Sequence, residues 1–145
     1  MAEKLTVQHF ENANEMMIAL PLVQQMYKDM SAEKLHDNLV EMIHANDYKM
    51  IAVYLDDKLV GICGYWVFLM LYCGRYIQIS NFIVDENYRN LGIGHKMMNY
   101  LENIGRNLGC KKFVLDSYTE NKKSHNLYFS EGFYIRGLHF MKDLT

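Results

Sequence analysis

A run of almost wholly apolar residues at positions 59–72 constrains the fold of this chain more than any other segment. A helix that crosses a bilayer needs about 20 such residues, and this run is shorter and is interrupted by Gly61 and Gly64. We therefore expect a long strand that is buried in a protein core, and not a membrane span.

Short turns on both sides of this strand predict its partners. Asp56-Asp57-Lys58 precedes it and Cys73-Gly74 follows it, and both sequences are typical of tight reversals. The strand-forming segments at residues 48–55 and 76–84 then become its hairpin neighbours. Consecutive hairpins give antiparallel pairing, so the middle of the chain predicts an antiparallel sheet.

The spacing of apolar residues predicts the remaining elements, at three and four for helices and at two for strands. Pro21 must kink the first helix or begin its second half, and Ser31 is the expected N-cap of the second. In chain order these elements are a strand at 5–10, helices at 14–30 and from 32, a long helix ending near 108, a strand at 112–116, a helix at 122–131 and a strand at 138–142.

The predicted order of elements is β-α-α-β-β-β-α-β-α-β. The strand–helix–strand unit at residues 76–116 requires a parallel neighbour, so the sheet is expected to be mixed. The fold class is α+β (mixed α/β), with one central, mostly antiparallel sheet flanked by helices. The length of 145 residues, without a repeat or a linker, predicts a single domain over residues 1–145.

Composition limits the partners and cofactors to be expected. A net charge of −2 gives no reason to expect nucleic acid or an anionic membrane surface as a partner. The three cysteines include no CxxC pair and the six histidines no HExxH motif, so we expect neither a disulfide framework nor a required metal. The opening residues, MAEKLTVQHF, contain no apolar signal core, and we expect a soluble, cytoplasmic protein.

The segment YRNLGIGHKMMNYL, residues 88–101, places two glycines at the entrance of an amphipathic helix. Glycine weakens a helix by roughly 1 kcal/mol relative to alanine, so Gly92 and Gly94 need another explanation. The first N–H groups of a helix have no internal partner and lie at its positive end, and glycine allows close approach to them. We expect a phosphate cradle here, with Arg89 and Lys96 as nearby cations; a simple glycine turn before a core helix is the alternative.

A second segment, NKKSHNLYFSEGF at residues 121–133, predicts a helix with polar groups on one face. Asn121, Ser124 and Tyr128 are three and four residues apart and therefore share that face. The alternative is that Tyr128 is an ordinary core tyrosine of an amphipathic helix.

Together the two segments resemble the GNAT superfamily of acyl-CoA N-acyltransferases. The resemblance covers nearly the whole chain and is strongest over residues 79–133. The C-terminal half looks most like the aminoalkylphosphonate and amino-sugar phosphate acetyltransferases. The resemblance implies an acetyl-CoA-dependent N-acetyltransferase, in which the amine attacks the thioester directly in a ternary complex.

The resemblance also implies where acetyl-CoA, the co-substrate, would bind. In that family the strand before the glycine turn splays at a bulge, and its free edge pairs with the pantetheine arm. Asn121 would contact the same arm, Ser124 stands where alanine is usual, and Tyr128 would face the acetyl sulfur as the catalytic acid or hydrogen-bond donor. The other implied contacts are Phe82, Ile83 and Val84 for pantetheine, and the amides of Arg89, Asn90, Leu91, Gly92, Ile93 and Gly94 for the pyrophosphate, with His95 and Lys96 nearby.

The general base is not identified by the sequence. An alkylammonium with a pKa near 10.4 is neutral in only about one part in 10³·⁴ at pH 7, a cost of roughly 4.6 kcal/mol, so its proton must be removed. Many relatives carry a carboxylate on the strand before the glycine turn, but here that strand offers Gln78, Ser80 and Asn81. The open alternatives are a water held by Gln78 and Asn81, or one of Asp116, Tyr118, Glu120 and His125; the oxyanion would be met by the amide of Ile83 or Val84.

The acceptor pocket would come from the two N-terminal helices and the apolar strand. Tyr65, Trp66, Phe68 and Tyr72 could line it, although strand core is the commoner place for such residues. The leading hypothesis is a small-molecule amine as acceptor. A protein lysine or N-terminus, or a non-catalytic role as an acyl-CoA sensor, are the alternatives, and a homodimer is possible because dimers are common in lookalike proteins.

Overall fold

The computed structural model describes residues 4–145. Its internal contacts divide the chain into two compact units, Met1–Val114 and Leu115–Thr145. The first unit contains the sheet and the helices that pack against it. Among the described residues, no helix combines the length and the apolar character needed to cross a membrane.

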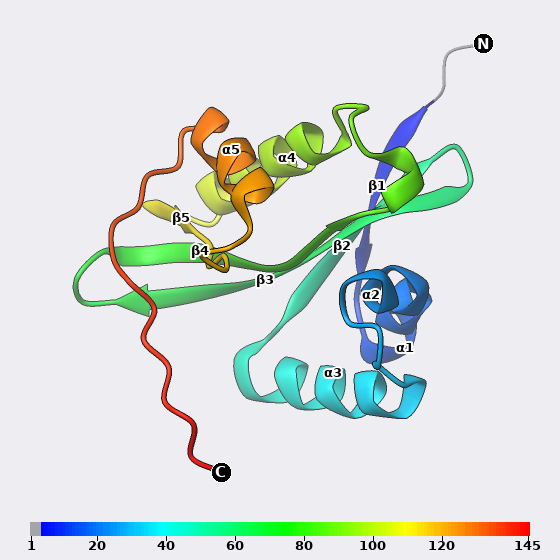
Figure 1. Ribbon diagram of the computed structural model, residues 1–145, viewed down its shortest axis with the longest axis horizontal. Helices are drawn as coiled ribbons and strands as arrows, with labels where there is room; N and C mark the ends of the chain where they lie inside the picture. Colours follow the sequence, from blue (N-terminus) through cyan, green and yellow to red (C-terminus); the bar gives the residue numbers. More distant parts are fainter. Residues whose placement is uncertain (1–3) are drawn as a thin grey trace. The chain divides into compact units, whose positions relative to one another are not determined.

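The sheet has five strands in the order of the sequence, β1-β2-β3-β4-β5 (Figure 1). The first four pair antiparallel, and β5 runs parallel to β4. The predicted mixed, mostly antiparallel sheet flanked by helices is therefore confirmed. Its strands are β1 Leu5–Phe10, β2 Lys49–Leu55, β3 Lys58–Met70, β4 Gly74–Val84 and β5 Lys112–Val114.

The long apolar run forms β3, but only its first half is buried. The strand is buried from Val60 to Tyr65 and becomes exposed at Leu69 and Met70, beside the turn that leads into β4. Leu71, in that turn, is fully exposed. The apolar run therefore contributes to the core over half of its length and to the protein surface over the rest.

Helices cover both faces of the sheet within the first unit. Alternate residues of a strand point to opposite faces, and Ile62 belongs to the core cluster formed with the N-terminal helices. The neighbouring Gly61 faces α4 Ile93–Asn107 instead, because a Cβ atom there would lie 2.8 Å from the Met97 sulfur. In Figure 1 the N-terminal helices and α4 accordingly lie on opposite sides of the sheet.

The first predicted helix is broken into three pieces. They are α1 Ala13–Met16, the 3-10 turn η1 Met17–Ala19, and α2 Leu20–Met26. Pro21 stands in the first turn of α2, where its missing N–H costs no helical bond, so it begins the second half as one of the two alternatives predicted. The helix ends at Met26 and not at residue 30, because Tyr27 leaves the helical conformation with φ of −118° and ψ of 87°.

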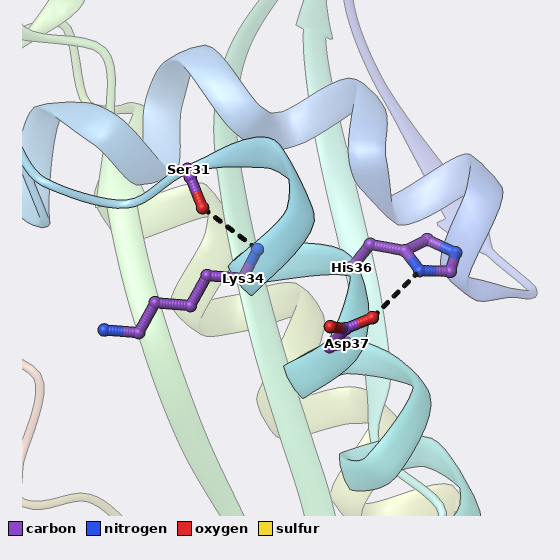
Figure 2. A network of polar contacts seen from close by, with 4 residues as sticks. All are labelled: Ser31, Lys34, His36 and Asp37. Carbon is purple, nitrogen blue, oxygen red and sulfur yellow. Dashed lines mark hydrogen bonds and ion pairs between the residues drawn. The ribbon is translucent and has the colours of Figure 1, made fainter.

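The next helix, α3 Ala32–Asn46, begins where the sequence predicts. The Ser31 Oγ accepts a hydrogen bond of 3.1 Å from the Lys34 N–H, which confirms Ser31 as the N-cap (Figure 2). Glu33 in the first turn adds a negative charge at the positive end of the helix. Figure 2 also shows His36 and Asp37 on the next turn, with His36 Nδ1 3.8 Å from Asp37 Oδ1.

The second unit contains α5 Lys122–Ser130 and no strand. The strand predicted at residues 138–142 is wrong, since residues 133–145 have no regular secondary structure. Alternating apolar side chains favour a strand locally, but a strand also needs a neighbour for its N–H and C=O groups, and alternation cannot supply one. The predicted helix ending at Gly132 is confirmed by that residue's φ of +91° after the C-cap Glu131.

Candidate functional site

Strand β4 contains a bulge in its second half. Ser80 lies opposite Gly64 and Ile83 lies opposite Ile62, so three steps along β4 match two along β3. The extra residue is accommodated at Asn81, whose φ is +59°. Asparagine tolerates this left-handed conformation better than most residues, and a bulge of this kind bends the strand and re-aims the residues after it.

Beyond the bulge, β4 is paired on one side only in the sheet that residues 4–145 form. The parallel pairing with β5 covers Tyr76 to Gln78 and stops at Val114. On the other side, pairing to β3 continues through Ile83 and Val84. The structure therefore brings Phe82, Ile83 and Val84 to an edge of the sheet, as the resemblance implies for the residues that meet pantetheine.

A tight turn connects this edge to α4. Asp85 is buried, and its carboxylate accepts a 2.9 Å hydrogen bond from the Asn87 N–H, which starts the 3-10 turn η2 Glu86–Tyr88. Arg89 then folds back, and its Nε donates to the Val84 carbonyl at 3.3 Å. The predicted cation is thus held beside the end of β4.

Two residues with left-handed backbone complete the turn. Asn90 has a φ of +64° and Gly92, the N-cap of α4, has a φ of +79°. A Cβ atom on Gly92 would meet nothing within 4 Å, so its backbone conformation, and not crowding, requires glycine there. Leu91, between them, is exposed.

The start of α4 lacks the groups that normally stabilise a helix N-terminus. The first helical bond runs from the Lys96 N–H to the Gly92 carbonyl at 3.2 Å, so the amides of Ile93 and Gly94 precede the helical ladder. No side chain caps the helix and no acidic residue lies in its first turn. His95 and Lys96 stand there instead, and Asn99 Nδ2 lies 3.2 Å from His95 Nε2.

A comparison of the two long helices makes this difference clear. Both α3 and α4 have 15 residues, but α3 has Ser31 and Glu33 at its start, whereas α4 has a glycine cap. Positive potential at the α4 N-terminus is therefore not neutralised by the described side chains of that turn. Such a turn can hold an anion on backbone N–H groups, with Arg89 and Lys96 as neighbouring cations.

The second motif forms its predicted helix in the second unit. Asn121 is the N-cap of α5, and its Oδ1 accepts a 3.4 Å hydrogen bond from the Ser124 N–H, a role that sequence reasoning missed. The Tyr128 ring packs edge-on against Phe133 at 5.9 Å, and the Phe133 N–H donates to the Tyr128 carbonyl at 3.0 Å. Both contacts fix the end of the helix that carries Tyr128.

Two of the candidate bases have partners within the same unit. His125 Nε2 lies 2.8 Å from the Tyr118 carbonyl oxygen, and Asp116 Oδ2 lies 3.6 Å from His139 Nδ1.

Asn81, which could hold a catalytic water, is also engaged, because its Oδ1 accepts hydrogen bonds from Tyr48 and Ser80. Since both lone pairs of that oxygen are used, Oδ1 cannot accept a further hydrogen bond from a catalytic water.

Aromatic side chains form a layer on the face of β3 and β4 that carries the N-terminal helices. Ring centroids are 5.0 Å apart for Tyr48 and Trp66, 6.0 Å for Trp66 and Phe68, and 5.8 Å for Phe68 and Tyr76. The Trp66 Nε1 is buried without a hydrogen-bond partner among the described residues. A donor of this kind is satisfied by an ordered water or by a ligand.

Tyr65, which could line the acceptor pocket, does not belong to this aromatic layer. Tyr65 lies opposite Ile79 and next to Trp66 in the strand, so its side chain points to the α4 face. The electrostatic effect of Tyr100, a residue of α4, on Tyr65 agrees with this. Burial, followed by the nearby Tyr100, raises the pKa of Tyr65 to about 12. Tyr72 lies in the exposed turn after β3.

No group of three His, Cys, Asp or Glu side chains within residues 4–145 is arranged to hold a metal ion. The three cysteines are free, and Cys63 is buried in β3 with its Sγ 3.9 Å from the Ser80 carbonyl oxygen of β4. Burial raises the pKa of the Cys63 thiol, so this thiol stays protonated and unreactive.

Comparison with known proteins relates this arrangement to a family. The profile of the acetyltransferase (GNAT) family matches residues 18–133. An uncharacterised N-acetyltransferase of Bacillus subtilis, YhdJ, is 21% identical over 123 residues, which cover 84% of this chain and 87% of that protein. The spermine/spermidine N(1)-acetyltransferase of the same organism is 30% identical over 95 residues, but the match covers only 62% of either chain.

Solved structures share the fold. The structure of an aminoglycoside N-acetyltransferase in complex with CoA superimposes with a TM-score of 0.83 at 15% identity, covering 100% of this chain and 98% of that one. The family profile matches well over half of the chain and includes both the glycine turn before α4 and the segment from Asn121 to Phe133. This chain belongs to the acetyltransferase (GNAT) family.

Proposed function

We propose that this protein transfers an acetyl group from acetyl-CoA to a primary amine of a small molecule, by direct attack in a ternary complex. One observation carries the proposal: the bulged edge of β4 leads within a few residues into the uncapped N-terminus of α4. An edge with unpaired peptide groups suits the amide-rich pantetheine arm, and an uncapped helix start suits the pyrophosphate.

The cofactor contacts in this proposal follow the chain. Phe82, Ile83 and Val84 pair with pantetheine through their backbone. The amides that hold the pyrophosphate are those of Arg89, Asn90, Leu91, Gly92, Ile93 and Gly94, with His95 and Lys96 beside them. By resemblance, Asn121, Ser124 and Tyr128 are also proposed to contact acetyl-CoA. A single acetyltransferase domain over residues 1–145 is part of the same proposal, and the family match over residues 18–133 supports it.

The proposed chemistry has three parts. The acceptor amine must lose a proton before it attacks the thioester carbonyl. The amide of Ile83 or Val84 then donates to the oxyanion of the tetrahedral intermediate, and Tyr128 donates to the departing CoA thiolate. β4 carries no carboxylate on residues 74–84, so the proton is proposed to leave through an ordered water near Gln78 or to one of Asp116, Tyr118, Glu120 and His125.

A small acceptor is proposed in preference to a protein. The relatives named above for polyamine and aminoglycoside acceptors are consistent with such a substrate.

Release of CoA thiol from acetyl-CoA tests the proposal. The purified chain is incubated with acetyl-CoA and with polyamines, aminoglycosides, amino sugars, a lysine peptide or a peptide with a free N-terminus. Turnover with a small amine is the expected result. Turnover with peptides alone would support protein acetylation, and CoA binding in calorimetry without thiol release from any amine would support an acyl-CoA sensor.

A homodimer and a cytoplasmic location are part of the same proposal. The second unit ends in a segment without secondary structure whose large apolar side chains are exposed, among them Ile135, Leu138, Phe140 and Leu144. Exposed apolar surface of this extent is typical of an association site. Light scattering after size exclusion tests it: a mass near 34 kDa, twice the 17.1 kDa of one chain, is expected, and a mass near one chain at micromolar concentration would contradict the dimer.

A further inference from the structure

The side chain of Asn81, at the β4 bulge, is held by three hydroxyl groups. Its Oδ1 accepts from the Tyr48 hydroxyl at 3.1 Å and from the Ser80 hydroxyl at 3.2 Å. Its Nδ2 donates to the Tyr27 hydroxyl at 3.1 Å. We refer to Tyr27, Tyr48, Ser80 and Asn81 as the bulge clamp. A side-chain amide with this many partners has one orientation, and the backbone to which it is attached is fixed with it.

Tyr48 is built into the core for this contact. It is 2% exposed, and burial raises the pKa of its hydroxyl, which therefore remains a proton donor. A tyrosine hydroxyl buried so deeply needs a partner, and Asn81 Oδ1 provides it.

Gly64 makes the contact possible. It lies directly opposite Ser80 in the register of β3 and β4, and a Cβ atom at Gly64 would overlap the Tyr48 hydroxyl. A glycine inside a strand often marks such a close approach. The Tyr48 ring therefore crosses over the Gly64 backbone to reach the bulge.

Helix α2 ties the same part of β4 at two points. Tyr27, its C-cap, bonds to Asn81 before the free edge, and Gln25 Oε1 accepts a 3.0 Å hydrogen bond from the Glu86 N–H after it. The segment between these ties is the one assigned to pantetheine in the proposed function. No described carboxylate or ammonium takes part in either tie.

We propose that Asn81 is a positioning residue: the hydroxyls of Tyr27 and Tyr48 hold its side chain, and this contact sets the direction in which the β4 edge presents its backbone to acetyl-CoA. The effect of Asn81 on acetyl-CoA binding rests on the proposed function. Its effect on the order of the β4 edge does not. Asn81 does not touch the reacting atoms in this assignment, and it acts through the backbone of the residues that come after it in β4.

The principal test is the substitution Asn81→Gly. Glycine keeps the left-handed backbone without strain and removes only the side chain; the Tyr48 hydroxyl that loses its acceptor costs about 1–3 kcal/mol. We expect KM for acetyl-CoA and Kd for CoA to rise at least about fivefold, with a smaller change in kcat. Tyr54→Phe, which removes a hydroxyl from the same face of β2 away from the bulge, is the matched control and leaves both constants unchanged.

A double-mutant cycle asks whether Tyr48 acts through Asn81. Tyr48→Phe alone should raise KM for acetyl-CoA, but it should have little further effect in the Asn81→Gly background. Fully additive effects would show that the two residues act independently, and they would overturn the clamp.

Hydrogen exchange makes the clamp testable without any ligand. In Asn81→Gly, the peptide over residues 79–86 should exchange at least about tenfold faster, while the peptide over residues 74–78 should not change. Unchanged exchange at 79–86 would overturn the inference. If exchange responds but the wild-type chain binds no CoA in calorimetry, the clamp stands and the proposed function fails.

Discussion

Gly92 and Gly94 lie two residues apart but have opposite backbone conformations. Gly92 has a φ of +79°, in the left-handed region, whereas Gly94 lies inside the first turn of α4. Only Gly92 therefore needs to be glycine for conformational reasons. The proposed pyrophosphate would account for the absence of a side chain at Gly94, and this separates the expected effects of substituting the two glycines.

Gly92→Ala should destabilise the protein. An L-residue in the left-handed region costs about 1–2 kcal/mol, and the open space around Gly92 does not reduce this cost. Urea denaturation monitored by circular dichroism measures it. If the free energy of unfolding is unchanged, the turn has relaxed to another conformation and the geometry described at the α4 N-terminus is not required.

Gly94→Asp should keep the stability of the free protein and weaken CoA binding. A carboxylate in the first turn interacts favourably with the helix dipole by about 0.3–1 kcal/mol, so the free protein should be at least as stable as the wild type. CoA affinity in calorimetry should fall at least about tenfold, because the new charge repels the pyrophosphate. An unchanged CoA affinity would show that the pyrophosphate does not bind at the N-terminus of α4.

Ser31→Ala is the matched control for these glycine variants. It removes the cap of α3 and should cost about 1 kcal/mol of stability, without any change in CoA affinity. A loss of affinity in this variant would mean that binding follows general stability, and the result for Gly94→Asp would then carry no information about the phosphate.

Tyr128→Phe should separate chemistry from binding. If the hydroxyl donates to the departing thiolate, kcat should fall at least about tenfold while Kd for CoA changes little. The ring itself, which packs against Phe133, is kept in this variant. Steady-state kinetics with the best amine checks the prediction, and wild-type turnover would exclude Tyr128 from the reaction.

Elements with a local cause could be predicted from the sequence. Ser31 caps α3 through a hydrogen bond three residues away, and Gly132 follows α5 through its own backbone preference. The glycine turn before α4 is predictable for the same reason, because the groups that define it are neighbours in the chain. The antiparallel hairpins around β3 depend on turns of a few residues.

Features that depend on distant partners could not be predicted. The strand expected at residues 138–142 required a neighbour, and the side of the sheet on which Tyr65 lies required the register of β3. The contact of Asn81 with Tyr27 joins residues 54 positions apart. Gly64, a glycine within a strand, was the one local sign that another side chain crosses β3 at this point.

Tyr65 should make the protein less stable at alkaline pH. Its folded-state pKa of about 12 lies above the value near 10 expected for an unfolded tyrosine, mainly because the ring is buried on the α4 face. Its contribution is complete below pH 10. As the pH rises from 10 to 12, the unfolded chain releases the proton before the folded chain does, so the free energy of unfolding falls by about 2 kcal/mol. Tyr65→Phe should lose stability less steeply over this interval, although the raised pKa values of Tyr48 and Cys63 leave part of the slope.

Urea denaturation of both proteins from pH 8 to 11.5 measures the difference. The two curves should run parallel between pH 8 and 9, where neither state releases the proton, and parallel curves above pH 10 would show that Tyr65 titrates normally and is not buried as described.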